Sequence, residues 1–352
     1  MNLDQRIDAF AALGNIFRQL SSPQEALEID QNDKVMVEAF QMQVNRAAEF
    51  NGWFTKDNVQ YAFSSWGESL RKEHLKQWLE NYSIEEKVTP RAVGIIMAGN
   101  IPLVGFHDFL SALITGHKVV VKLSSNDPYF IPLVAQYLSH NYPYFKEKID
   151  FASDKLENYD AVIATGSNNS SRYFEHYFGS YPNIIRKNRN AVAILAGNET
   201  IEELELLGED IFRYFGLGCR SVSKLYVPKG YDFDQLFGGL YRYNEIINYK
   251  KYENNYDYNK AVYLMSLFPI LENGFVMLKE DTGFSSPIAT LFYEFYESTD
   301  DLTAHLNAVK DNIQCIVSNE NFKDFINFGD SQSPKLWNYA DDIDTIEFLL
   351  NI

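Results

Sequence analysis

One cysteine in this sequence stands where covalent chemistry is possible. Residues 215–228 read FGLGCRSVSKLYVP, in which Cys219 follows two glycines and precedes a β-rich run. Glycines allow a backbone to approach a substrate closely. Arg220 and Lys224 add positive charge, which favours the thiolate form that acts as a nucleophile. A lone cysteine is more often an inert, buried residue, and Cys315, in a β-branched run, has that interpretation.

Several common catalytic motifs are missing from the sequence, which narrows the chemistry. We find no Gly-x-Gly-x-x-Gly after a strand and no phosphate-binding P-loop, so phosphoryl transfer from ATP is disfavoured. The six histidines show no metal-ligand spacing, and no Gly-x-Ser-x-Gly elbow of a serine hydrolase occurs. We therefore expect no metal site. The remaining possibility is a cysteine nucleophile in a chain whose nucleotide site, if it binds one, lacks these common motifs.

The elements that must position Cys219 follow an alternating strand and helix pattern. The first ninety residues show helical spacing of apolar residues. After them, the pattern predicts strands at 92–98, 117–123 and 159–164, with helices at 106–115, 127–140 and 168–178. It further predicts a strand at 191–197, a helix at 199–214, and strands at 224–227, 312–318 and, at the end, 345–350. This alternation is typical of a doubly wound α/β fold with parallel sheets.

Length and composition limit the class of protein. With 352 residues the chain exceeds the usual size of a single core, so two domains are expected. A net charge of −17 disfavours nucleic acid as a partner, because phosphates repel an acidic surface. No apolar run reaches the roughly 20 residues of a membrane span, and the N-terminus lacks the pattern of a signal peptide. Two distant cysteines fit a reducing cytoplasm.

Five segments taken together resemble one superfamily. GNIPLVG, VVVKLSSND, ATGS, FGLGCRSVSK and DTGFSSPIAT occur in the order seen in aldehyde dehydrogenases. They are most similar to the acyl-CoA and acyl-protein reductase branch, the LuxC-like fatty acid reductases of bacterial luminescence. The resemblance covers about residues 90–320. It implies two doubly wound α/β domains with the site in the cleft between them, preceded here by a helical N-terminal region.

The resemblance implies roles for two catalytic residues. Cys219 matches the family's nucleophile, which would attack a thioester and become acylated. Asn100 matches the asparagine whose side-chain amide helps to form the oxyanion hole, together with the backbone N–H of the cysteine. Without the resemblance, Asn100 is simply a turn residue before a proline.

The resemblance also implies a nicotinamide cofactor. Lys122 matches the lysine that reaches the adenosine ribose, and Ser124 and Ser125 follow it. NAD-preferring members have a glutamate at the place of Ser125; a serine can donate to a 2′-phosphate, so NADPH is favoured over NADH. Gly166 and Ser167 match the turn that opens a helix at the dinucleotide phosphates, where helix N-terminal amides suit anions.

Two further points come from the same comparison. Glu280 matches the glutamate that holds the nicotinamide ribose, although its neighbours differ from the family's pattern. Oxidising aldehyde dehydrogenases have a water-activating glutamate some thirty residues before the cysteine, whereas here the segment reads NIIRKNRNAVAIL, without a carboxylate. An acyl-enzyme lacking that base should survive until hydride arrives, which suits reduction to an aldehyde.

These inferences define the expected organisation and function. We expect a helical region at 1–88, a dinucleotide-binding domain at 89–188, a catalytic domain at 189–320, and a segment at 321–352 that returns to the first domain. The expected reaction is NADPH-dependent reduction of an acyl thioester, carried by CoA or by a protein, to the aldehyde. The alternatives are another superfamily reaction on a semialdehyde or acyl phosphate, and an inactive relative that acts as a binding subunit. A cytoplasmic homo-oligomer is compatible with each of them.

Overall fold

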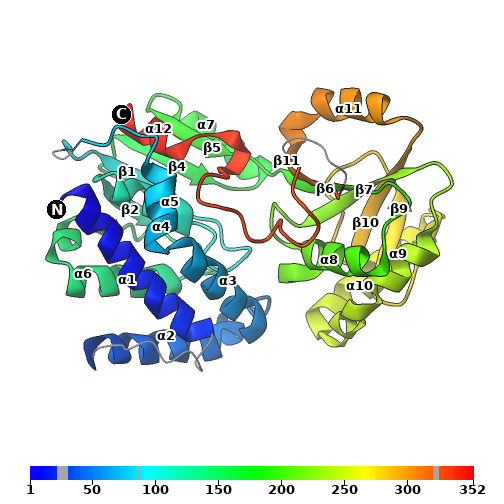
Figure 1. Cartoon of the computed structure of the whole chain (residues 1–352), viewed down its shortest axis with the longest axis horizontal. Helices are drawn as coiled ribbons and strands as arrows, with labels where there is room; N and C mark the ends of the chain where they lie inside the picture. Colours follow the sequence, from blue (N-terminus) through cyan, green and yellow to red (C-terminus); the bar gives the residue numbers. More distant parts are fainter. Residues whose placement is uncertain (22–30, 86–87, 320–324) are drawn as a thin grey trace. The chain divides into compact units, whose positions relative to one another are not determined.

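The chain folds into two compact units in the computed structural model, which describes residues 1–21, 31–85, 88–319 and 325–352 (Figure 1). Unit 1 contains Met1–Lys187 together with Lys335–Ile352, and unit 2 contains Asn188–Pro334. The backbone therefore passes from one unit to the other twice. The helical N-terminal region and the C-terminal stretch both belong to unit 1.

Unit 1 is built on a parallel sheet with the strand order β3-β2-β1-β4-β5. Its strands are β1 (Ala92–Ile96), β2 (Lys118–Lys122), β3 (Ile149–Phe151), β4 (Ala161–Thr165) and β5 (Asn183–Arg186). In the register, Val93 of β1 lies opposite Val119 of β2 on one side and Ala161 of β4 on the other. Since the chain runs outward from β1 in both directions, the order reverses between β1 and β4. This confirms the predicted α/β class.

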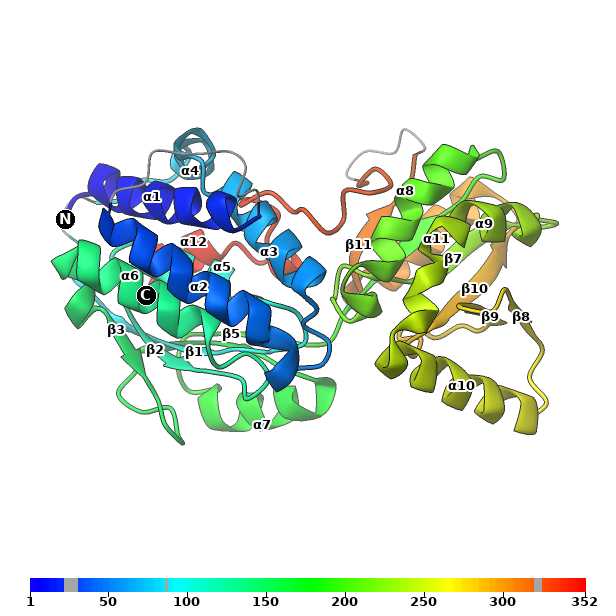
Figure 2. The same cartoon turned by 90° about the horizontal axis from the view of Figure 1, so that it is seen from below.

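Helices cover both faces of the unit 1 sheet. They are α1 (Leu3–Ser21), α2 (Gln31–Phe50), α3 (Lys56–Ser69), α4 (Lys72–Leu79), α5 (Phe106–Ile114), α6 (Phe130–Asn141), α7 (Asn168–Phe178) and α12 (Thr345–Leu350), with 3-10 turns η1 (Pro143–Glu147) and η5 (Ala340–Asp342). Figure 2 shows α1, α2 and α6 on one side of the sheet and α7 on the other. Apolar residues of α1 at helical spacing, such as Phe10, Leu13 and Phe17, are fully buried. Phe178 of α7 packs with sheet residues in a separate core on the opposite face.

The C-terminal stretch does not form the strand that its β-rich composition predicts. Residues Thr345–Leu350 are helix α12, capped by the Asp344 side chain, which accepts from the backbone N–H of Glu347. The prediction was wrong because a short apolar run does not distinguish a buried strand from a buried helix. Helix α12 packs against α5, and its Leu349 is fully buried.

Unit 2 contains a second sheet, with the strand order β11-β6-β7-β10-β9-β8. Its strands are β6 (Asn190–Ile194), β7 (Val222–Pro228), β8 (Ile270–Glu272), β9 (Met277–Glu280), β10 (Thr290–Tyr296) and β11 (Ile313–Val317). The pairs are parallel except that of β8 with β9. Central strand β7 is buried along almost its whole length, as expected for a strand covered on both faces.

The helices of unit 2 again lie on both sides of the sheet. They are α8 (Ile201–Phe212), α9 (Phe233–Leu240), α10 (Lys250–Met265) and α11 (Thr299–Ala308), with 3-10 turns η2 (Arg213–Gly216), η3 (Tyr241–Asn248) and η4 (Lys310–Asn312). In Figure 1, α11 covers one face, whereas α8 and α9 cover the other. A capping box between Thr200 and Glu203 begins α8, the helix that leads to Cys219.

Candidate active site

Cys219 lies in a tight turn between the 3-10 turn η2 and strand β7. The turn is closed from both sides by Ser221: its backbone N–H donates to the Gly218 carbonyl at 3.0 Å, and its hydroxyl accepts from the Gly218 N–H at 3.2 Å. Ser221 is buried, whereas Cys219 remains partly accessible to solvent. The structure therefore leaves this cysteine available to a reagent that enters from solvent.

The backbone before Cys219 is strained. Tyr214, Phe215 and Gly216 follow one another in the left-handed region, with φ angles of 55°, 58° and 76°. For residues with side chains this conformation costs about 1–3 kcal/mol each and persists only where the surroundings enforce it. The ring of Phe215 stacks on Tyr249, with centroids 4.8 Å apart. Such strain is concentrated at functional sites, and here aromatic packing maintains it.

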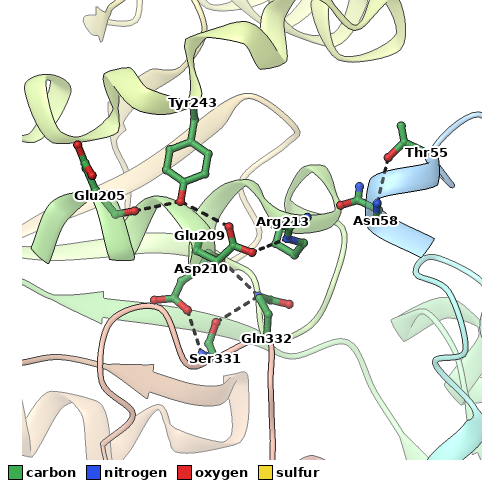
Figure 3. A network of polar contacts seen from close by, with 9 residues as sticks. All are labelled: Thr55, Asn58, Glu205, Glu209, Asp210, Arg213, Tyr243, Ser331 and Gln332. Carbon is green, nitrogen blue, oxygen red and sulfur yellow. Dashed lines mark hydrogen bonds and ion pairs between the residues drawn. The ribbon is translucent and has the colours of Figure 1, made fainter. Parts of the chain in front are cut away.

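A polar network fixes the end of α8 immediately before this turn (Figure 3). Arg213 forms an ion pair with Glu209, and the Tyr243 hydroxyl donates to the Glu205 carbonyl at 3.0 Å. On the other side, the buried Asp210 carboxylate accepts from the backbone N–H of Ser331 at 2.9 Å. Burial raises the pKa of Asp210 to about 6, and hydrogen bonds from the Ser331 side chain and from the backbone N–H groups of Gly329 and Ser331 partly oppose that shift. The helix end thus has little freedom to move.

A cavity of about 240 Å³ adjoins the Cys219 turn within unit 2. It is lined by Asn188, Asn190, Ile211, Phe215, Gly216, Leu217, Val222, Ser223, Val276, Ser285, Ser286, Pro287, Ile288, Ala289, Thr290 and Leu291. Two lining segments flank Cys219 in the chain, one just before it and one at the start of β7. Among these described lining residues, none carries a side chain that titrates near neutral pH. The cavity is accordingly neutral, and residues on either side of Cys219 in the chain, though not Cys219 itself, line it.

One wall of the cavity is a chain of neutral hydrogen bonds. The Ser285 hydroxyl donates to the Asn190 side-chain oxygen at 2.6 Å and accepts from the Asn188 amide at 3.2 Å. Asn188 and Asn190 belong to the segment NIIRKNRNAVAIL. This segment corresponds to the one that contains the water-activating glutamate in oxidising aldehyde dehydrogenases. The structure thus places amides and a hydroxyl along this wall, and these groups do not act as strong bases.

The second cysteine lies on β11, in the same sheet. Burial raises the pKa of the Cys315 thiol to about 12, and the nearby Arg220 partly opposes this. Cys315 is therefore protonated at neutral pH and is a poor nucleophile. As whole residues both cysteines are partly accessible, so it is the raised pKa of the Cys315 thiol that leaves Cys219 as the stronger candidate.

In unit 1, the loop after β1 carries the predicted oxyanion residue, Asn100, which is exposed. Two contacts hold this loop against the loop after β2. The buried Asp127 carboxylate accepts from the Leu103 backbone N–H at 2.9 Å, and Leu103 itself has a φ of 60°. A Cβ at Gly99 would lie 2.5 Å from the Ser124 hydroxyl oxygen, so only glycine permits this close approach.

The residues predicted to bind the cofactor lie largely along the carboxyl edge of the unit 1 sheet. Lys122 is the last residue of β2, followed by Ser124 and Ser125, and its ammonium donates to the Ser153 carbonyl at 2.6 Å. Gly166 and Ser167 follow β4, where Ser167 caps the N-terminus of α7. Because β2 and β4 flank β1 in a parallel sheet, these groups emerge at the same edge.

The predicted site residues are divided between the two units. Asn100, Lys122 and the four predicted residues in the loops after β2 and β4 belong to unit 1, whereas Cys219 and Glu280 belong to unit 2. Glu280 is the exposed last residue of β9. Residues that the sequence did not single out also line the cavity, above all Ser285. The only signal for it was the DTGFSSPIAT segment, which resembles the superfamily without indicating a role for any serine.

Two kinds of feature are absent from the part of the chain that the structure describes. We find no cluster of three or more His, Cys, Asp or Glu side chains that could hold a metal ion. Within the same ranges, no helix has the length and apolarity needed to cross a membrane.

Comparison with known sequences yields a family and two relatives. Residues 16–235 match the family described as acyl-CoA reductase (LuxC). A long-chain acyl-protein thioester reductase 2 of Photobacterium leiognathi is 26% identical over 212 residues, covering 54% of this chain and 44% of the relative. The long-chain acyl-protein thioester reductase of Aliivibrio fischeri is 25% identical over 168 residues, covering 43% and 35%. The chain thus matches less than half the length of these relatives.

Comparison with solved structures identifies the fold. Aldehyde dehydrogenase 21 of Physcomitrella patens matches with a TM-score of 0.61 and 13% identity, over 99% of this chain and 88% of that one. The putative aldehyde dehydrogenase PutA of Anabaena variabilis matches with a TM-score of 0.59 and 15% identity, over 90% and 78%. The predicted aldehyde dehydrogenase-like fold is confirmed.

Proposed function

Because the chain belongs to the acyl-CoA reductase (LuxC) family, we propose that it reduces an acyl thioester to an aldehyde through an acyl-enzyme on Cys219, with NADPH as hydride donor. The Cys219 thiolate attacks the thioester carbonyl, a new carbon–sulfur bond forms, and the bond to the donor thiol breaks. The freed thiol leaves with one proton. A bound nicotinamide cofactor would supply hydride to the carbonyl carbon of the acyl-enzyme, and Cys219 would then leave as thiolate when the aldehyde is released.

The observation that carries this proposal is the neutral cavity lined by residues that flank Cys219 in the chain. A water molecule that enters it meets amides, hydroxyls and apolar groups from the described lining, and no carboxylate or imidazole of that lining can deprotonate it. General-base assistance accelerates such a step by about 10²–10⁴-fold. Without it, hydrolysis of the acyl-enzyme is slow, and the acyl group persists until it is reduced.

The oxyanion formed in each step needs a donor. We assign this role to the Asn100 side-chain amide, with the Cys219 backbone N–H as its partner. One such donor is typically worth about 3–4 kcal/mol in the transition state. The contacts of Leu103 with Asp127 and of Gly99 with Ser124 support this assignment, because they restrain the loop that carries the amide.

The carboxyl edge of the unit 1 sheet suits a dinucleotide. In such sheets ligands bind where the strand order reverses, which here is between β1 and β4. A Cβ at Gly166 would lie within 2.9 Å of Phe174 and Ser170, so glycine keeps the turn before α7 tight. The first amides of α7 would hold the phosphates, and Lys122 with Ser125 would hold the adenosine ribose and a 2′-phosphate. When bound, the cofactor supplies the hydride.

The acyl donor is CoA or a carrier protein. The two relatives are named acyl-protein thioester reductases, which supports a protein-bound acyl group. The carboxyl edge and the Cys219 cavity do not by themselves favour one carrier, so the first experiment uses acyl-CoA of several chain lengths.

The first prediction tests the nucleophile. After mixing with acyl-CoA without NADPH, the peptide containing Cys219 should gain the mass of the acyl group, and Cys219→Ala should lose both this gain and all turnover. Cys315→Ala, with its protonated thiol removed, is the matched control and should keep both. Acylation of any other residue would contradict the proposal.

The same experiment separates the alternative functions. Acylation by acyl phosphate but not by acyl-CoA would favour the acyl-phosphate reaction, and no acylation of any kind would favour a binding subunit.

A further inference from the structure

Strand β7 carries a lysine whose charged group lies wholly inside unit 2. The Lys224 side chain is 0% exposed, and its ammonium forms an ion pair with Glu294 of β10. The same nitrogen donates to the backbone carbonyls of Asp281 and Gly283 at 3.0 and 3.1 Å. It also lies 5.0 Å from the centre of the Phe284 ring. All three proton positions of the ammonium thus have acceptors, which is how a buried charge is tolerated.

The preceding residue on β7 contacts the same segment. The Ser223 hydroxyl donates to the Phe284 carbonyl at 2.6 Å. Together, Ser223 and Lys224 hold three carbonyl groups between residues 281 and 284. Two neighbouring side chains of β7 therefore contact the same short segment.

The segment held in this way leads directly into the cavity wall. Residues 285–291 line the cavity, beginning with Ser285, which bonds to Asn188 and Asn190. Farther along, the Asn259 amide donates to the Ile288 carbonyl at 2.9 Å. The wall is therefore anchored at its beginning by β7 and at its middle by α10.

We propose that Lys224 and Ser223 are positioning residues that hold the cavity wall at a fixed place relative to Cys219. This inference rests on the proposed role of Cys219 as the nucleophile. Cys219 lies in the turn that leads into β7, only five residues before Lys224, so the thiol and the residues that hold the wall are close together in the chain. Any substrate bound against residues 285–291 is thereby placed in register with the sulfur.

The contacts distinguish this role from a simpler one. The sequence suggests that Lys224 lowers the pKa of Cys219 through its charge. In the structure that charge is balanced by Glu294 and directed at carbonyl groups of the 281–284 segment. Lys224 therefore acts through position, and removal of its charge together with that of Glu294 should leave the thiol's ionisation unchanged.

The test uses Lys224→Met with Glu294→Gln, which removes both charges without leaving one of them buried and unpaired. Acylation of Cys219 by acyl-CoA, followed by mass spectrometry, should have a maximal rate lower by on the order of 10²-fold, as expected for a misplacement of about 1 Å. Backbone amides in residues 281–291 should exchange hydrogen faster. The pH dependence of Cys219 alkylation by iodoacetamide should match that of wild type.

The matched control is Lys229→Met. Lys229 pairs with Glu297 at 3.1 Å where β7 and β10 end, but both side chains are exposed. This variant should acylate at the wild-type rate. Ser223→Ala, which removes one hydroxyl, should show a smaller change in the same direction as the double variant.

Two results would overturn the inference. One is wild-type acylation and exchange in the double variant; the other is an alkylation profile shifted to higher pH with unchanged exchange, which would assign Lys224 an electrostatic role. If wild-type protein is not acylated at all, the proposed function fails instead. The rate of hydrogen exchange in residues 281–291 still decides whether Ser223 and Lys224 hold this segment in place.

Discussion

At the scale of single residues, the fate of an acyl group on Cys219 depends on what surrounds it. Asn188, Ser285 and Asn190 form a hydrogen-bonded chain in which no member is a strong base. A carboxylate at the same place could take a proton from water and direct that water at the acyl carbonyl. The difference between reduction and hydrolysis is then a difference of one functional group on this wall.

The second prediction follows from this. Asn190→Asp keeps an oxygen that accepts from Ser285 and adds a carboxylate, so acyl-CoA should be hydrolysed without NADPH, roughly 10²-fold faster than in wild type. Release of CoA thiol and of free acid measures the rate. Asn255→Asp on α10, outside the cavity lining, makes the same charge change and should have no effect. Normal acylation with no release of acid would show that the neutral wall is not what protects the acyl group.

At the scale of elements, two loops of unit 1 are joined. The loop after β1 carries Asn100, and the loop after β2 carries Asp127 and two of the predicted cofactor residues, Ser124 and Ser125. The Asn51 amide donates to the carbonyls of Gly99 and Asn126, one in each loop, at 3.4 and 3.3 Å. The proposed oxyanion donor and cofactor contacts therefore share one rigid support.

The third prediction concerns that support. Burial raises the pKa of Asp127 from 3.8 to about 6, so the folded state binds its proton more tightly than the unfolded chain does. Its stabilising effect is complete below about pH 4 and is lost as pH rises through about 6. Asp127→Asn cannot ionise, so between pH 4 and 7 wild type should lose about 2–3 kcal/mol of unfolding free energy relative to this variant.

Urea unfolding at several pH values measures this difference. Asp127→Ala provides the contrast, because it leaves the Leu103 N–H without its acceptor and should be less stable than Asp127→Asn by about 1–3 kcal/mol. A difference between wild type and Asp127→Asn that does not vary with pH would contradict the assignment.

At the scale of the whole molecule, the last residues of the chain complete the first unit. The Tyr339 hydroxyl accepts from the Trp78 indole N–H at 2.8 Å, and Arg186, paired with Asp108, donates to the Thr345 hydroxyl at 3.1 Å. Unit 2 is thus inserted into unit 1, whose stability depends on both ends of the sequence.

A buried histidine, His117, also joins the C-terminal stretch to the rest of unit 1. The Arg91 N–H donates to Nδ1 of His117 at 3.1 Å, so Nε2 carries the proton and donates to the Leu349 carbonyl at 2.8 Å. Burial lowers the pKa of His117, and the neutral ring that this arrangement requires is therefore the favoured form.

The fourth prediction tests this dependence. Leu349→Ala, at a fully buried side chain of α12, should lower the stability of unit 1 by about 2–5 kcal/mol. Ile343→Ala, in the same stretch but 37% exposed, is the control and should cost much less. Hydrogen exchange resolved by peptide should increase in unit 1 and remain unchanged in residues 188–334. An equal increase in both units would mean that they unfold together.

The sequence by itself determined many of the elements before residue 230 and the nucleophile candidate, Cys219. Strand β1, helix α5 with its glycine end, and strand β2 were all predictable, because apolar periodicity and turn residues act over short distances. The family resemblance added Asn100, Lys122 and the missing glutamate. It did not prevent the error at residues 345–350, where only packing against α5 decided between helix and strand.

Tertiary structure alone decided how distant segments meet. Ser285 reaches Asn188 and Asn190 across almost a hundred residues, and Lys224 reaches Asp281 and Gly283, because β6, β7 and β10 are neighbours in one sheet. Local patterns state which segments become strands, but not which strands pair or in what register. Those choices depend on how the whole core is buried at once. They bring residues that flank Cys219 in the chain together with residues 285–291 in the lining of one neutral cavity.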